Sequence, residues 1–513
     1  MKGKAAVKGG IAMANITDLS KTRYCKGVQC PKILWLDAYK PEVGENVLSE
    51  QVMKNGNAVG DLARPYFGAF SLVDFSYNKQ EMTGQTAQYI RDGAETIAEA
   101  AFLTDGLYCA VDLLHRNGDG WDIIEVKSST HLTDIYIEDI AFQYYVLTRC
   151  GMEVKRVHNL HLNGDYVLHG ALDLRELFVL EDVTDVVRRK YDDVEQQIAV
   201  IRAYVSVTEE PEREIGLHCE NPYACAYQTY CWRHLPEHSV FDLAGMQAKT
   251  KFRHYANGIV SYEDLLAHAD GLRLNEKQRR QIESRLHHLP DTIDRKGIQA
   301  FLNTLQYPLY HLDFETYQTP IPEFDGTKPY QQIPFQYSLH IEQQDGSLAH
   351  REFLAEEGAD PRRALAEQLV RDIPMGACCL AYNMSFEKMV IKSLAAQFSD
   401  LASHLMNIHD NLHDIMLPFR NQSYYSTEME GSYSIKKVLP ALYPNDPELD
   451  YHNLSNVHNG SEASAAFAEM GTFSPEEQAA YRQALLKYCE LDTYAMVKVL
   501  RKLREAVEAY PSK

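Results

Sequence analysis

The sequence predicts an α/β protein with two mixed domains and a helical segment between them. Three observations lead to this prediction. Residues 85–180 alternate between helical and strand-like patterns, residues 240–305 keep a helical period without strand-like runs, and strand-like runs return from residue 307 onward. A chain of 513 residues is long enough for two or three hydrophobic cores. We therefore expect domains at 1–239, 240–305 and 306–513.

The first domain is expected to alternate helices and strands around a hairpin. Its predicted elements are a helix over residues 83–103, strands at 107–114 and 121–128, and a helix over 136–151. The run His-Arg-Asn-Gly-Asp-Gly between the two strands is rich in turn formers and predicts an antiparallel hairpin. A helical pattern from Val183 leads to a cysteine-rich segment that closes the domain.

The last domain is expected to begin with strands and to end in a long helix. Strand-like runs occupy residues 309–315, 334–343, 348–355 and 377–383. An amphipathic pattern then runs to residue 510 from Ser474 and Pro475, which are typical residues at the start of a helix.

Charge and hydropathy narrow the class of protein. The net charge of −21 argues against a protein that coats nucleic acid, because Lys and Arg contacts to phosphate dominate such binding. An acidic enzyme that cuts phosphodiester bonds remains possible, since metal-binding carboxylates sit in a cleft. No apolar run is long enough to span a bilayer, and the first dozen residues are expected to form a flexible leader. We expect a cytoplasmic protein with no membrane partner and with reduced cysteines.

The predicted hairpin carries acids and a lysine in a pattern that indicates metal-assisted hydrolysis. Glu125 and Lys127 are two residues apart and so share one face of their strand, and the turn brings Asp112 beside them. Two carboxylates can hold Mg²⁺ or Mn²⁺, while the lysine orients or deprotonates the attacking water. The alternative is an exposed hairpin face with mixed charges.

The surrounding residues 106–130 resemble the RecB-type PD-(D/E)xK nucleases, which have a restriction-endonuclease-like fold. The resemblance implies catalytic roles for Asp112, Glu125 and Lys127, with Asp112 and Glu125 as metal ligands. It also implies that Glu99, expected on the preceding helix, is an additional acidic metal ligand. Gln143 matches the glutamine of the motif that follows, whereas the tyrosine expected four residues later is Leu147.

Four cysteines extend this resemblance. Cys219, Cys225 and Cys231 form the one tight group, and Cys30 precedes the nuclease-like region. One cysteine before the core and three after it resemble the iron-sulfur subset that includes CRISPR adaptation nucleases and AddB, which implies a [4Fe-4S] cluster. Four thiolates suit Zn²⁺ equally well by ligand count. Cys25 is the alternative to Cys30.

A second set of acids lies in the last domain. Asp313 and Glu315 alternate on a predicted strand and therefore project from one face, where their repulsion calls for a cation. Together with Glu387 after a later strand, and with Tyr488 and Asp492 four apart on a helix, they resemble the DEDD exonucleases of the ribonuclease H-like superfamily. The resemblance implies that the four acids bind two metal ions and that the tyrosine positions water. Glu387 stands where aspartate is usual.

The combination resembles bacterial fusions of an iron-sulfur RecB-type nuclease with a DEDDy exonuclease, joined here by a small helical domain. It implies a metal-dependent DNA nuclease, mainly an exodeoxyribonuclease, acting on single strands or free ends in repair, recombination or phage defence. Two alternatives stay open. The protein could be an RNA exonuclease, because 2′-hydroxyl contacts are not visible in the sequence, or a nucleic-acid binding scaffold in which one site is inactive.

Overall fold

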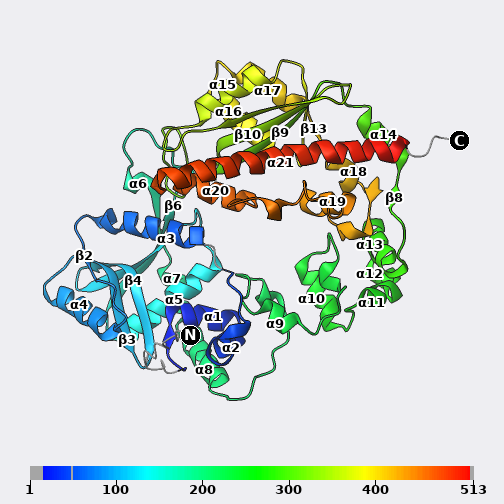
Figure 1. Cartoon of the computed structure of the whole chain (residues 1–513). Helices are drawn as coiled ribbons and strands as arrows, with labels where there is room; N and C mark the ends of the chain where they lie inside the picture. The colour runs from blue at the N-terminus through cyan, green and yellow to red at the C-terminus, as the bar shows by residue number, and fades with distance from the viewer. Residues whose placement is uncertain (1–15, 48–49, 509–513) are drawn as a thin grey trace, which may run out of the picture. The chain divides into compact units, whose positions relative to one another are not determined.

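The computed structural model describes residues 16–47 and 50–508, and it confirms the α/β class. The chain divides into two compact units (Figure 1). Unit 1 runs to His234 and includes Thr319–Tyr330, and unit 2 contains Leu235–Gln318 and the residues from Gln331 onward. The predicted helical segment 240–305 is counted with unit 2. The predicted leader lies outside the described residues.

Unit 1 is built on a mixed sheet. The strands follow the order β2 (Ser71–Leu72), β3 (Thr96–Thr104), β4 (Leu107–Asn117), β5 (Gly120–Lys127), β6 (Val154–Leu162) and β7 (Phe178–Asp182), and β1 (Leu19–Ser20) pairs with β4. The expected hairpin is present, since β4 and β5 pair in antiparallel register and Leu113 lies opposite Ile124. β5 and β6 are parallel and are joined by a helix, as a crossover connection requires.

Helices cover both faces of this sheet. They are α1 (Lys21–Gln29), α2 (Pro31–Tyr39), α3 (Glu50–Ala63), α4 (Lys79–Arg91), α5 (Asp134–Arg149), α6 (Leu174–Leu177), α7 (Thr184–Arg189), α8 (Tyr191–Val205) and α9 (Gln228–Trp232). Residues of α1, α5 and α8 share one hydrophobic core with the sheet, and α3 packs in a second core. Tyr330, far along the chain, donates a hydrogen bond of 2.6 Å to the Ser128 carbonyl oxygen within this unit.

The predicted helix over residues 83–103 is wrong in its second half. The α4 helix ends at Arg91, Gly93 follows with φ +80°, and β3 begins at Thr96. Asp92 and Gly93 are a helix stop signal that the periodicity hides, because alanines suit either element. Pairing with β2 and β4 on both sides then overrides the helical preference of this alanine-rich stretch. Glu99 therefore lies on a strand.

Unit 2 contains a five-stranded sheet in the order β11 (Leu348–Leu354), β10 (Ile333–Glu342), β9 (Leu309–Tyr317), β12 (Cys378–Ala381) and β13 (Leu412–Asp414). The first three strands are antiparallel, and β9, β12 and β13 are parallel. A separate pair, β8 (Thr292–Ile293) with β14 (Tyr424–Tyr425), corrects the expectation that residues 240–305 hold no strand.

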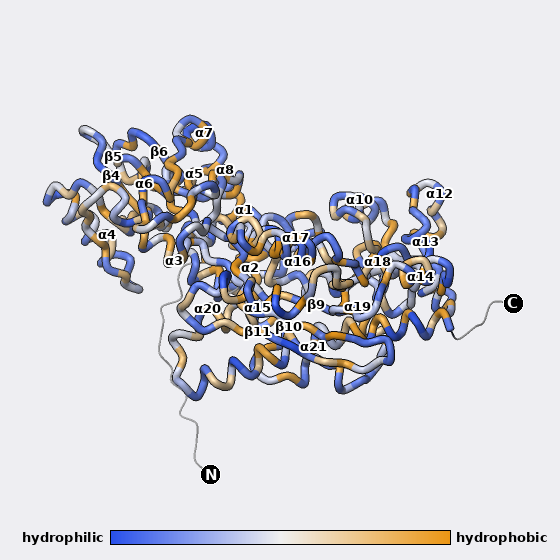
Figure 2. The backbone as a smooth tube through the Cα atoms, turned by 90° about the horizontal axis from the view of Figure 1, so that it is seen from above, coloured by the Kyte–Doolittle hydropathy of each residue, from blue (hydrophilic) through white to orange (hydrophobic). Residues whose placement is uncertain are grey.

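The helices of unit 2 are of two kinds, because those between residues 248 and 287 share a core of their own and others cover the faces of the sheet. They are α10 (Ala248–Ala256), α11 (Tyr262–Ala267), α12 (Ala269–Leu272), α13 (Glu276–His287), α14 (Arg295–Leu302), α15 (Arg362–Asp372), α16 (Ser385–Gln397), α17 (Ala402–Asp410), α18 (Leu417–Arg420), α19 (Ile435–Leu442), α20 (Gly460–Glu469) and α21 (Pro475–Glu508). α15, α16 and α17 lie on one face and the long α21 crosses the other (Figure 1). Hydrophilic and hydrophobic residues alternate along α21 (Figure 2), as expected of a helix with one face on a sheet. Among the helices of the described ranges, none is long and apolar enough to cross a membrane.

Candidate functional sites

Four of the residues predicted for the first site meet near the carboxyl end of β5, namely Asp112, Glu125, Lys127 and Gln143. Lys127 Nζ lies 2.7 Å from Glu125 Oε1, and Gln143 on α5 donates its Nε2–H to Glu125 Oε2 at 2.7 Å. Asp112 on β4 accepts a hydrogen bond of 2.7 Å from the Val126 backbone N–H. Glu125 is only 1% exposed, so this carboxylate is buried within a set of charged and polar partners.

Two charged residues of this site were missed by the sequence analysis. Lys21, the first residue of α1, places Nζ 2.8 Å from Glu125 Oε1. Asp139 on α5 accepts from Lys127 Nζ at 2.5 Å and lies 3.8 Å from the Lys21 ammonium. A local signal existed for Asp139, because it stands four residues before Gln143 on the same helix face. No local signal exists for Lys21, whose contact depends on the fold.

The charges of this cluster hold its two central acids in different states. Burial and the neighbouring Glu125 carboxylate raise the pKa of Asp112 to about 7. Burial would also raise the pKa of Glu125, but the ammonium groups of Lys127 and Lys21 outweigh it and hold that pKa well below its usual range. Glu125 is therefore an anion at neutral pH, whereas Asp112 is poised between its two protonation states.

Glu99 lies beside the cluster, at an interruption of β3. The pairs Ala98–Leu113 and Ala100–Val111 flank it, which places it opposite Asp112. Glu99 has φ +57°, an uncommon conformation for a residue with a side chain, and burial raises its pKa. Within the described residues, its carboxylate forms no group of three metal-ligating atoms within 4.8 Å together with Asp112 and Glu125. Glu99, Asp112 and Glu125 are thus neighbours on the sheet, but their ligand atoms do not form one compact group.

The four predicted cysteines line a single pocket. Cys30 lies between α1 and α2, Cys219 and Cys225 lie in the loop before α9, and Cys231 lies on α9. Cys25, the alternative to Cys30, does not line this pocket and instead packs against the main core of unit 1. Four convergent thiols fit a thiolate-bound metal group.

The spacing of the sulfur atoms can be compared with that in a zinc site. In a tetrahedral zinc site with Zn–S bonds of about 2.3 Å, the sulfur atoms lie about 3.8 Å apart. Across the described ranges, no three cysteine sulfurs lie within 4.8 Å of one another. Burial raises the pKa of the Cys225 thiol to about 11, and a bound cationic metal reverses that shift by stabilising the thiolate. The described thiols therefore do not form a compact tetrahedral set as they stand, and their number suits a [4Fe-4S] cluster or a Zn²⁺ ion.

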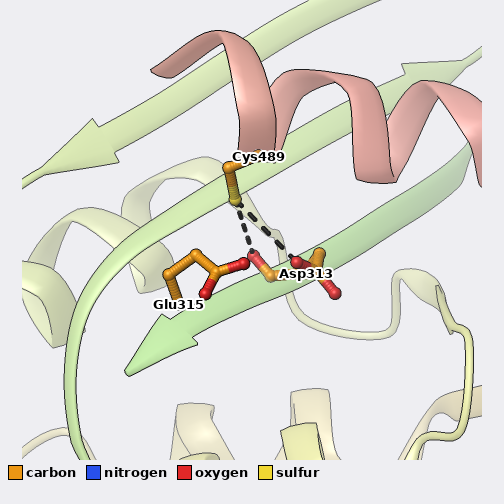
Figure 3. Close-up of side chains that lie close together, drawn as sticks. All are labelled: Asp313, Glu315 and Cys489. Atoms are coloured by element: carbon orange, nitrogen blue, oxygen red, sulfur yellow. Dashed lines mark hydrogen bonds between the residues drawn. The ribbon is translucent and has the colours of Figure 1, made fainter. Parts of the chain in front are cut away.

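The second site begins on β9, beneath α21. Asp313 and Glu315 point to the same side of the strand, toward Cys489 on the helix (Figure 3). The Cys489 thiol lies 3.9 Å from Asp313 Oδ2, and the ligand atoms of these three residues lie within 4.8 Å of one another. The alternating strand and the helix above it therefore create a group of potential metal ligands in which Glu315 and Cys489 are buried and Asp313 is half-buried.

The other predicted residues of this site come from two helices. Glu387 lies in the first turn of α16, is 3% exposed, and has an Oε2 atom without a hydrogen-bond partner. Asp492 on α21 accepts a hydrogen bond of 2.6 Å from the hydroxyl of Tyr451, a residue that the sequence analysis missed. Tyr488, one turn before Asp492, is 5% exposed. These residues form one electrostatically coupled cluster with the two acids of β9.

Two further residues shape this cluster. A side chain at Gly460, the first residue of α20, would begin 3.6 Å from Glu315 Oε2 and 4.0 Å from the Tyr488 hydroxyl, so glycine keeps that space open. Asp414, at the end of β13, accepts backbone N–H bonds from Asn383 at 2.9 Å and Met416 at 3.0 Å. It fixes the entry to α16, where Asn383 has φ +68°.

Mutual repulsion governs the electrostatics of the second site. Burial, together with the charges of Asp492 and Glu387, raises the pKa values of Asp313 and Glu315 well above their usual range. Burial raises the pKa of Glu387 to about 8 and that of Asp492 to about 6. Lys436 lowers the pKa of Glu315. Two buried acids, Glu315 and Glu387, beside two half-buried ones, Asp313 and Asp492, are suited to divalent cations.

Comparisons with known proteins bring two similarities. The family described as "Domain of unknown function (DUF2779)" matches residues 310–434, a region that contains Asp313, Glu315 and Glu387. An uncharacterized protein, UU173, from Ureaplasma parvum serovar 3 is 26% identical over 212 residues, which cover 37% of this chain and 30% of that protein. The match thus spans less than a third of that relative's length.

Proposed function

We propose that the chain is a metal-dependent nuclease that hydrolyses DNA phosphodiester bonds at two sites. The observation that carries this proposal is the cluster of four acids with raised pKa values, in which Glu315 and Glu387 are buried and Asp313 and Asp492 are half-buried. Such an arrangement costs stability unless divalent cations neutralise it. These four carboxylates are the metal ligands that the resemblance to the DEDD exonucleases implies.

The topology of unit 2 supports a ribonuclease H-like fold. Its sheet has three antiparallel strands followed by a parallel pair, with acids on the central β9 and helices on both faces. In unit 1, an antiparallel hairpin followed by a parallel β5–α5–β6 crossover supports a PD-(D/E)xK fold, because the acids and lysine lie at the end of β5. The proposal thus gives each α/β unit a specific fold.

In the second site, the four acids would hold Mg²⁺ or Mn²⁺. Divalent cations bound there would supply charge neutralisation and Lewis-acid polarisation of the phosphodiester. Tyr488 would orient the attacking water, because its hydroxyl lies near Glu315 at the space that Gly460 keeps open. Tyr451 holds Asp492 in place through its hydrogen bond. The predicted product is a chain shortened from its 3′ end.

In the first site, Asp112 and Glu125 would hold a divalent cation, with Glu99 as an additional ligand. Gln143 orients Glu125 through the hydrogen bond to Oε2. Lys127 is fixed between Glu125 and Asp139, so its ammonium has a defined direction from which to orient water. Cys30, Cys219, Cys225 and Cys231 would hold a [4Fe-4S] cluster that fastens the ends of unit 1 together.

Degradation of end-labelled substrates tests this proposal. Single- and double-stranded DNA and RNA, labelled at the 5′ or 3′ end, are incubated with the full chain and Mg²⁺ or Mn²⁺. We expect DNA cleavage that Lys127→Ala and Asp313→Ala each reduce in part and that the double variant abolishes. Lys155→Ala, which removes a lysine paired with Asp119 on the surface, is the control.

Each alternative has its own outcome in this experiment. Degradation of RNA in preference to DNA would identify an RNA exonuclease. Binding without cleavage, or cleavage lost entirely in one single variant, would indicate a scaffold or a chain with one inactive site. A reproducible nuclease activity that neither variant changes would contradict the assignment of both sites.

A further inference from the structure

Lys21 joins the first site from outside the motif that defines it. It follows β1, which pairs with β4 through Leu19 and Leu107, and it begins α1 after the N-cap residue Ser20. Arg23 anchors this turn by donating to the carbonyl oxygens of Asp18 and Ile16. The backbone of Lys21 is therefore fixed, and the reach of its side chain to the acids is built into the fold.

Two ammonium groups already contact one oxygen of the Glu125 carboxylate. Its Oε1 atom accepts from Lys21 Nζ at 2.8 Å and from Lys127 Nζ at 2.7 Å, and its Oε2 atom accepts from Gln143. A cation at the remaining position of Oε2 would lie beside two positive charges, in a buried place where like charges repel strongly. One ammonium has to leave before Glu125 can serve as a ligand.

The two lysines differ in how tightly they are held. Lys127 has a second carboxylate partner at 2.5 Å in Asp139, so it keeps a full ion pair if it releases Glu125. Lys21 has its second carboxylate at 3.8 Å, and its side chain is 25% exposed compared with 19% for Lys127. Lys21 is thus the ammonium that leaves Glu125 at lower cost and has access to solvent.

We propose that Lys21 occupies the position of the divalent cation in the metal-free first site and is released from Glu125 when the cation binds. It is a positioning residue, because it acts on Glu125 and not on the substrate. The inference rests on the proposed function of the first site. Its consequence is that Lys21 stabilises the metal-free chain and competes with the metal.

Metal binding to matched variants tests this competition. The full chain carrying Asp313→Asn and Asp492→Asn, which disable the second site, is titrated with Mn²⁺ and followed by electron paramagnetic resonance and by thermal unfolding. We expect Lys21→Met to tighten Mn²⁺ binding several-fold, to lower the unfolding temperature in EDTA, and to increase the stabilisation by Mn²⁺. Lys21→Arg should restore wild-type behaviour, and Lys155→Met should change nothing.

A second measurement needs no substitution at Lys21. The chain with Asp313→Asn and Asp492→Asn is labelled with an amine-reactive reagent and analysed by mass spectrometry. Lys21 should be modified faster with Mn²⁺ than in EDTA, with Lys155 as the internal reference. Equal Lys21 labelling in both conditions, or Mn²⁺ affinity that Lys21→Met leaves unchanged or weakens, would overturn the inference alone. If Glu125→Gln removes no Mn²⁺ binding from this chain, the proposed first site is overturned as well.

Discussion

At the scale of single residues, Glu387 is the departure that matters most for the second site. It stands where the DEDD pattern has aspartate, and its carboxylate is buried in the first turn of α16 with one oxygen unpaired. A buried acid without a full set of hydrogen bonds favours its neutral form. The longer side chain is therefore compatible with the cluster, and its charge depends strongly on whether a cation is present.

This leads to a pH prediction for Glu387 in the metal-free chain. Its pKa is raised from 4.5 to about 8 in the folded protein, so the folded state binds the proton more tightly than the unfolded state. The associated stability is complete below about pH 4.5 and is lost as the pH rises through about 8. Glu387→Gln should flatten the fall in unfolding temperature between these values when it is measured in EDTA. Adding Mn²⁺ should flatten it for the wild type, and an identical pH profile for both chains in EDTA would contradict this reading.

At the scale of elements, the two ends of unit 1 meet in a small apolar core that includes Ile33, Trp35 and Tyr227. The α9 helix has five residues, fewer than an isolated helix needs to be stable. Gln29 bridges the two ends by donating to the carbonyl oxygens of His218 at 2.8 Å and Tyr223 at 2.7 Å. The cysteine pocket lies at this junction, so a bound cluster would add a covalent fastening between α1, α2 and α9.

Loss of one cysteine should therefore weaken unit 1 selectively. We expect Cys225→Ser to remove the visible absorbance of an iron-sulfur cluster and to lower the unfolding temperature by several degrees, while cleavage at the second site persists. Cys150→Ser, which alters an exposed cysteine elsewhere in the unit, is the control. A colourless wild-type protein that contains zinc would instead identify the pocket as a Zn²⁺ site.

At the scale of the whole molecule, net charge limits how the chain can hold a polyanion. If the chain acts as proposed, its charge of −21 would limit contacts to phosphate to a few local ones, and cations bound in the two sites would supply part of the attraction. Each unit has its own sheet, its own cores and its own acid cluster. Binding of DNA and its cleavage should accordingly be two activities that can be measured separately.

The salt dependence of DNA binding tests this view. Each phosphate contact contributes about 0.7 to the slope of log affinity against log salt for single strands. We expect a shallow slope that corresponds to only a few contacts, and an affinity that rises when Ca²⁺ is added to support binding without cleavage. Fluorescence anisotropy with a labelled single strand measures both quantities, and a slope that corresponds to about ten contacts would be inconsistent with the acidic surface.

The sequence determined the features that depend on short-range patterns. The alternation of Asp313 with Glu315, the spacing of Tyr488 and Asp492, and the turn before Glu125 each reflect a local period, which strands and helices preserve. It failed where two conformations compete locally, as in the alanine-rich strand that carries Glu99. There, pairing with neighbouring strands decided the outcome.

Only the tertiary structure decided which distant residues complete the sites. Lys21 reaches Glu125 across 104 positions, and Tyr451 reaches Asp492 across 41. The selection of Cys30 over Cys25 likewise follows from which thiol faces the pocket. A hydrogen bond or an ion pair depends on distance and direction in space, and no local period encodes these for residues that the fold alone brings together.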